Sequence, residues 1–224
     1  MTNYKNFLIF SVIAVFLSFF ALSGCSKAGD NLVSEGMNAF KKQDYDAAIT
    51  YLNQALESET NYSNELIYTL LANTYTQKHD WNTAIEYHKK ALELRSDYTS
   101  YILLGALCHE AQRDEEAEKA YKDAIDLAPK RAEAYGSLGA LYLKQEKVDE
   151  AIEFLEKSVS INYRLGIVHA DLAVAYALKG DSEKAYAALG EAEKRKAENF
   201  DSFKARVDSI LGNAPSLTSV PTAD

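Results

Sequence analysis

The chain has 224 residues, with 24 Lys and Arg against 33 Asp and Glu, which gives a formal net charge of −9. Binding to nucleic acid needs clustered basic side chains, so this acidic balance argues against nucleic acid as a partner. It also disfavours broad contact with anionic lipid. Only two cysteines are present, Cys25 and Cys108, so one disulfide is the most the chain can form.

The amino-terminal segment has the features of an export signal. Lys5 is the only charged residue among the first 24, and 16 uncharged residues follow from position 7 to position 22. A bilayer-spanning helix takes about 20 apolar residues, so this shorter stretch is typical of a cleaved signal peptide. Residues 22–25 (LSGC) then resemble a bacterial lipobox. The alternatives are an uncleaved anchor, or an ordinary signal peptide with a chance cysteine.

The lipobox resemblance implies a covalent lipid on Cys25 and removal of residues 1–24 as a lipoprotein signal peptide. We then expect residues 25–30 to be a short lipid-anchored tether, which reaches at most about 20 Å. The protein would lie in the cell envelope, close to its membrane. Ser26 stands where an Asp tends to cause inner-membrane retention, which favours the outer membrane, on its periplasmic or surface face, in a Gram-negative cell.

A segment of about 34 residues recurs five times between residues 31 and 197, a span that Pro129 alone interrupts among the three prolines. Each copy carries an alanine at the same place, and a glycine or alanine twelve residues earlier. The aligned alanines are Ala48, Ala84, Ala117, Ala151 and Ala185, and the earlier small residues are Gly36, Ala72, Gly105, Gly139 and Ala173. This pattern resembles the tetratricopeptide repeat (TPR), a pair of antiparallel helices. The resemblance implies an all-α, right-handed TPR solenoid of five repeats.

The residues after the fifth repeat predict a capping helix over 198–211. Phe200, Phe203, Val207 and Ile210 recur at helical spacing and give this segment one apolar face. Such a face can cover the open end of a repeat stack. Residues 212–224 contain two prolines and little to bury, so we expect a disordered tail.

No catalytic or metal-binding constellation stands out. His88 and His169 fall on packing positions of the repeat, and Cys108 falls on a core position with no ligand-spaced cysteine or histidine pair. We therefore expect a buried free thiol, no metal, no cofactor besides the lipid, and no enzymatic activity.

The TPR resemblance also implies a concave groove lined by positions 2, 5, 9, 12 and 13 of each first helix. The expected partner-binding residues are Leu66, Thr69, Asn73, Thr76, Gln77, Ile102, His109, Glu110, Leu143, Lys144, Val174 and Leu178. The groove would begin polar, where the amides of Asn73 and Gln77 can hydrogen-bond an extended peptide. It would end apolar at Leu143, Val174 and Leu178, unless the capping helix or the tail covers that end.

These features predict a membrane-anchored scaffold that binds a protein or peptide partner near the membrane, for assembly of an envelope complex. Its layout resembles that of pilus-assembly and pilotin-type TPR lipoproteins. Two alternatives stay open. One is a regulator or accessory subunit of a cell-wall enzyme, and the other is a carrier whose groove takes a hydrophobic ligand.

Overall fold

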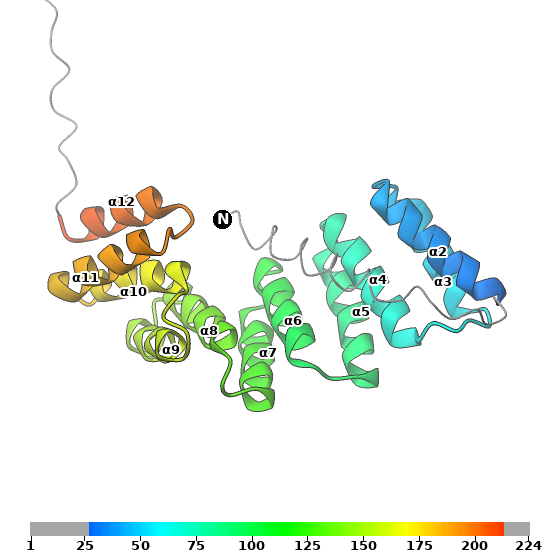
Figure 1. The fold of residues 1–224 in the computed structure, drawn as a ribbon, viewed down its shortest axis with the longest axis horizontal. Coiled ribbons are helices and arrows are strands. Elements are labelled where there is room, and N and C mark those ends of the chain that lie inside the picture. Colours follow the sequence, from blue (N-terminus) through cyan, green and yellow to red (C-terminus); the bar gives the residue numbers. More distant parts are fainter. Residues whose placement is uncertain (1–26, 213–224) are drawn as a thin grey trace, which may run out of the picture. The chain divides into compact units, whose positions relative to one another are not determined.

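The computed structural model describes residues 27–212, and every regular element in that range is an α-helix (Figure 1). The helices are α2 (Ala28–Lys41), α3 (Tyr45–Leu56), α4 (Asn64–Gln77), α5 (Trp81–Leu94), α6 (Tyr98–Glu110), α7 (Asp114–Leu127), α8 (Ala132–Lys144), α9 (Val148–Ile161), α10 (Gly166–Leu178), α11 (Ser182–Lys194) and α12 (Phe200–Ile210). No helix within residues 27–212 is both long and apolar enough to cross a membrane. The predicted signal peptide, Cys25 and the tail beyond Gly212 lie outside the described residues.

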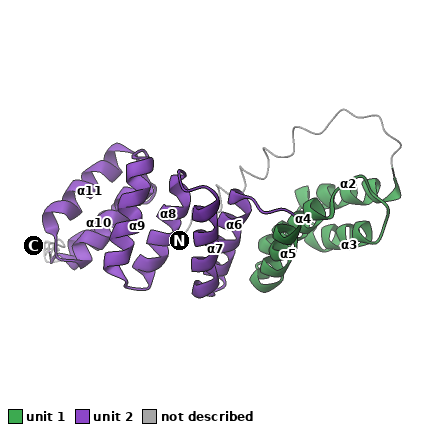
Figure 2. Cartoon of the chain, turned by 90° about the horizontal axis from the view of Figure 1, so that it is seen from below, with its two compact units in different colours: residues 1–94 green, residues 95–224 purple. Residues whose placement is uncertain are grey.

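The chain forms two compact units that divide after Leu94 (Figure 2). Unit 1 holds the antiparallel pairs α2/α3 and α4/α5. Unit 2 holds α6/α7, α8/α9 and α10/α11, followed by α12. The all-helical fold and the division of each predicted repeat into two helices are thus confirmed.

Small residues let the two helices of each pair approach closely. All five aligned alanines are fully buried. The glycines that precede three of them contact the partner helix of the same pair: Gly36 faces Leu52, and Gly139 faces Leu155. A methyl group on Gly139 would lie 2.6 Å from Leu155 Cγ, closer than packed carbon atoms allow. Close packing of this kind, with large residues between pairs, forms the core of each stack.

The turn inside each pair has the same conformation. Gln43, His79, Gln112, Glu146 and Gly180 all have positive φ, between 59° and 81°. In each turn the next residue donates its backbone N–H to a carbonyl five residues earlier, as Arg113 does to Cys108 over 2.8 Å. This arrangement satisfies carbonyls that the ending helix leaves unpaired. Only the fifth turn uses glycine, the residue for which positive φ carries no steric cost.

Helix α12 packs on α10 and α11, the last helix pair of unit 2, which is the position expected of a capping helix. Phe200 and Phe203 pack against a buried cluster that includes Ala170 of α10 and Ala192 of α11, and Val207 is fully buried. The apolar face inferred from the spacing of these side chains is therefore the face that covers the stack.

The start of unit 1 differs from the predicted boundary. The sequence places residues 25–30 in a tether, but α2 begins at Ala28. The Asp30 carboxylate explains the earlier start, because it accepts hydrogen bonds from Thr60 Oγ1 (2.8 Å), Asn61 N (2.7 Å), Asn61 Nδ2 (2.8 Å) and Lys27 N (3.1 Å). These bonds, the one from the Asn61 backbone N–H foremost, lower the pKa of Asp30 from 3.8 to about 2.

Replacing Asp30 by asparagine is expected to lower the urea midpoint of unit 1 at pH 7, read from Trp81 fluorescence. Because the folded-state pKa is depressed, the stability that Asp30 contributes is present above about pH 4 and is lost as the pH falls towards 2. The wild-type and variant midpoints should therefore converge in acid. Glu35→Gln removes one exposed acid from the same helix and serves as the control. Equal midpoints at pH 7 would show that the Asp30 bonds do not hold α2.

Candidate partner-binding surface

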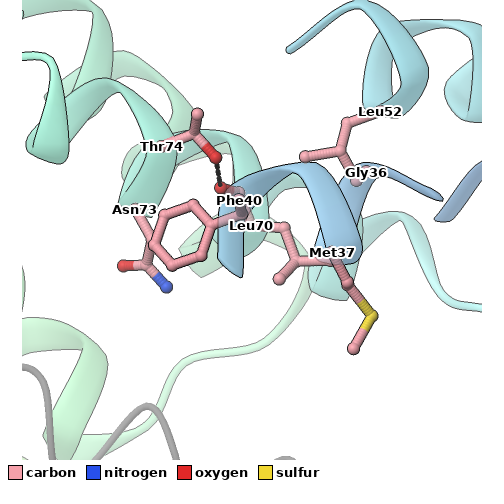
Figure 3. A pocket seen from close by; sticks show the side chains of 7 residues that line it. All are labelled: Gly36, Met37, Phe40, Leu52, Leu70, Asn73 and Thr74. Atoms are coloured by element: carbon pink, nitrogen blue, oxygen red, sulfur yellow. Dashed lines mark hydrogen bonds between the residues drawn. The ribbon is translucent and has the colours of Figure 1, made fainter. Parts of the chain in front are cut away.

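Unit 1 contains a small recess between α2, α3 and α4 (Figure 3). Its apolar lining comes mainly from Met37 and Phe40 of α2, Leu52 of α3 and Leu70 of α4. Asn73 of α4 adds a carboxamide beside the Phe40 ring. Thr74 also lines the recess, but its hydroxyl donates to the Leu70 carbonyl oxygen over 2.7 Å. The recess thus joins an apolar surface to one available polar group, the combination that orients a bound ligand.

The predicted polar positions on α4 fall into two classes. The hydroxyl groups of Thr69 and Thr76 donate to backbone carbonyls of their own helix, those of Glu65 (2.9 Å) and Ala72 (2.8 Å). The side-chain amides of Asn73 and Gln77 have no hydrogen-bond partner among residues 27–212. These two amides are therefore the groups on α4 available to a partner, while Leu66, also predicted, is half-buried.

Met37 and Phe40 are absent from the predicted set, although both line the recess with Asn73. The signal that identifies them is present in the sequence. Applying the repeat positions to the first repeat, with Gly36 at position 8, places Met37 at position 9 and Phe40 at position 12. The first repeat contributes no predicted groove residue because its sequence matches the family pattern poorly, with Ala39 in place of a large aromatic residue.

Unit 2 brings two predicted positions together around an acidic side chain. His109 Nδ1 of α6 lies 3.3 Å from Asp114 Oδ1 of α7, and Lys144 Nζ of α8 lies 3.4 Å from the same oxygen. The His109 Nδ1 atom is buried, and its geometry towards Asp114 does not form a hydrogen bond. Glu110 at the end of α6 is exposed, and Ile102 packs against the cluster around Tyr98.

The predicted apolar end of the groove is largely covered. Leu143 is 5% exposed and Val174 is fully buried, so neither can contact a partner in this conformation. Helix α12 packs near this end of the stack, where Phe200 and Phe203 contact the cluster that includes Ala170 of α10. Leu178 alone of the three is accessible, with 42% exposure. The position of a residue in the repeat predicts which face of the helix it occupies, but it does not predict which other segment packs on that face.

Asp171 lies on α10, half-buried, and burial raises the pKa of its carboxyl group to about 7, while Arg206 of α12 opposes that rise. Because the folded-state pKa is raised, the stability of unit 2 should fall as the pH rises from about 4 to 7. Asp171→Asn should stabilise unit 2 by about 1–2 kcal/mol at pH 8, after a discount for the partial exposure of the side chain.

The same substitution should change little at pH 4, where the folded-state carboxyl is already protonated. Urea unfolding followed by circular dichroism at the two pH values tests this. Asp201→Asn, at an exposed site in the first turn of α12, is the control. A gain at pH 4 equal to that at pH 8 would contradict ionisation as the cause.

The residues assigned to packing by the sequence are buried. His88, His169 and the free thiol of Cys108 lie in the core, as predicted. His169 Nε2 lies 2.9 Å from the carbonyl oxygen of Tyr163, which holds the loop before α10. Within residues 27–212, no three His, Cys, Asp or Glu side chains form a group that can hold a metal ion.

Comparison with solved structures identifies similar repeat proteins. A MamA protein is 26% identical, with a TM-score of 0.66, over 77% of this chain and 94% of that one. A tetratricopeptide repeat protein from Parabacteroides merdae is 17% identical, with a TM-score of 0.74, over 83% and 74%. PilF of Pseudomonas aeruginosa is 22% identical, with a TM-score of 0.64, over 83% and 85%. The last two likenesses show the fold alone. No curated protein matches the chain.

Three family models match, and each is described as a tetratricopeptide repeat. They cover residues 31–62, 63–130 and 109–164, and together they span more than half of the chain. The helix pairs, the aligned buried alanines and the shared turn are the structural counterpart of these matches. The chain belongs to the tetratricopeptide repeat family.

Proposed function

We propose that this protein is a lipid-anchored TPR scaffold that binds a protein or peptide partner in the cell envelope and supports assembly of an envelope complex. The observation that carries the proposal is the recess of unit 1, where the Asn73 amide stands beside the apolar side chains of Met37 and Phe40. A peptide can hydrogen-bond the amide through its backbone while it places a small apolar side chain against Phe40.

The volumes and linings of the two described cavities argue against a buried hydrophobic small molecule. The recess has a volume of about 10 Å³, room for about one water molecule. A larger depression of about 750 Å³ lies between the middle of α9, the end of α10 and the start of α11. Charged side chains line much of it, among them Glu156, Lys179, Glu183 and Lys184. Neither site suits an acyl chain, so the carrier function has less support.

The anchoring half of the proposal rests on the lipobox resemblance at Cys25, which lies outside the described residues. Mass spectrometry of the protein from cell membranes should find a chain that begins at Cys25 and carries a diacylglyceryl group on its sulfur. Cys25→Ala should release the protein from the membrane fraction. An unmodified Cys25 on a full-length chain would contradict the anchor and leave partner binding to be judged separately.

Partner binding is tested by a photo-crosslinking amino acid placed at Asn73 in living cells. We expect a discrete adduct there, and none from the same group at Asn82, an exposed position near the start of α5. The identity of the crosslinked protein then distinguishes a scaffold for an envelope complex from a regulator of a cell-wall enzyme. Equal labelling from the two sites would show that the recess is not the binding surface. Leu143→Glu, by contrast, would be a poor probe, because it places a charge at a buried position.

A further inference from the structure

The start of α2 determines which part of unit 1 meets the lipid. If Cys25 carries the anchor, only Ser26 separates it from Lys27, the first described residue. Two residues of extended chain span at most about 7 Å. We propose that unit 1 lies against the bilayer through one edge, made by the start of α2, the loop 57–63, the start of α4 and the end of α5. This membrane-facing edge rests on the proposed lipid attachment.

The start of α2 cannot swing away from the loop 57–63. Gly29 donates its backbone N–H to the carbonyl oxygen of Glu59 over 3.0 Å, and Asp30 accepts bonds from Thr60 and Asn61. The contact leaves no space between the two segments, because a methyl group on Gly29 would lie 2.7 Å from the Glu59 oxygen. A short anchor on such a fixed helix start holds the whole edge close to the lipid.

The rest of the edge follows from the antiparallel packing of α4 and α5. Helix α4 begins at Asn64, directly after the loop, so the neighbouring α5 ends at the same side of unit 1 (Figures 1 and 2). The last residue of α5 is Leu94, a large apolar side chain that is 57% exposed. A leucine at this place can enter the headgroup region of a bilayer.

The charge of the edge specifies the kind of lipid surface. The edge exposes three carboxylates, those of Glu57, Glu59 and Glu93. Lys27, directly before α2, adds one exposed cation. Anionic headgroups repel an acidic surface over about 10 Å at 0.1 M salt. The membrane-facing edge therefore fits a surface of zwitterionic phospholipids. Negatively charged lipid should tilt the start of α4 and the end of α5 away from the surface, while the anchored start of α2 stays close to it.

The only tryptophan of the chain provides the test. Trp81 is the first residue of α5 and marks the side opposite to the edge, about 20 Å from Asn64 along the 14 residues of α4. The double variant Trp81→Phe, Asn64→Trp moves this reporter to the edge at an exposed position. Each lipidated protein is reconstituted into phosphatidylcholine vesicles that carry brominated acyl chains, and circular dichroism checks the fold.

We expect the vesicles to quench the fluorescence of the double variant, whose reporter stands at position 64, and to leave the Trp81 fluorescence of the wild-type chain unchanged. Replacing part of the phosphatidylcholine by phosphatidylglycerol should reduce quenching at position 64, and added salt should restore it. Equal quenching at positions 64 and 81 would contradict the membrane-facing edge. So would the absence of quenching at position 64 in a protein that floats with the vesicles, although that protein would still be anchored. A protein without lipid on Cys25 that fails to float overturns the anchor, and the edge with it.

Discussion

Gly139→Ala is expected to destabilise unit 2 by about 1–3 kcal/mol, the usual cost of adding volume to a packed core. The new methyl group would lie 2.6 Å from Leu155 Cγ and 3.1 Å from Leu155 N. A side chain can rotate away from such a contact, but the backbone nitrogen can move only if α9 moves away from α8. Urea unfolding followed by far-UV circular dichroism measures the loss.

Gly190→Ala is the matched control, because Gly190 also lies inside a helix of unit 2, α11. A methyl group there meets nothing within 4 Å. This substitution should stabilise the protein by about 0.5–1 kcal/mol, since alanine restricts the unfolded chain more than glycine does. Equal stabilisation by Gly139→Ala and Gly190→Ala would contradict the interpretation that position 139 requires glycine because α8 and α9 approach closely there.

Tyr98→Phe should also destabilise unit 2 by about 1–3 kcal/mol, the cost of leaving a buried backbone donor without a partner. The Tyr98 hydroxyl accepts the backbone N–H of Ala134 over 2.9 Å and donates to Glu133 Oε2 over 3.1 Å. Arg131, before α8, has no side-chain capping bond, so Tyr98 of α6 caps this helix from the preceding repeat. Phenylalanine keeps the ring and its stacking with the Arg131 guanidinium, 3.9 Å from the ring centroid.

The control for this variant is Tyr101→Phe. Tyr101 packs against the same cluster, and its hydroxyl has no hydrogen-bond partner among residues 27–212. Its removal should change the free energy of unfolding by no more than about 0.5 kcal/mol. Burial raises the pKa of Tyr98 to about 12, so the stability it contributes is fully present below pH 10 and is lost as the pH rises towards 12. Equal effects of the two variants would contradict the capping role.

The repeat fold could be predicted because its signal is periodic and local. The aligned alanines such as Ala48 and the glycines such as Gly139 mark helix contacts at fixed spacing. The apolar face of α12 follows from the spacing of Phe200, Phe203 and Val207 in the same way. Each of these features is encoded within about 34 residues, so the sequence displays them directly.

The remaining features depend on contacts that spacing does not encode. Helix α2 starts early because Asp30 bonds to Thr60 and Asn61, about 30 residues away. Leu143 and Val174 occupy expected positions of the repeat but are buried, which depends on what packs over them. Asn73 was predicted as a groove residue, but the recess that it lines with Met37 and Phe40 was not, because the first repeat was left out of the predicted groove.

The cap that Tyr98 supplies to α8 affects how unit 2 can unfold. Helices α7, α8, α9 and α10 begin without side-chain caps from their own N-cap residues. In α8 the missing acceptor comes from a residue 36 positions earlier. Melting α6 would therefore also free the first turn of α8, which couples two repeats beyond their shared apolar surface. The repeats of unit 2 are therefore not interchangeable. Removing the third repeat would leave the first turn of α8, in the fourth repeat, without the acceptor that Tyr98 supplies.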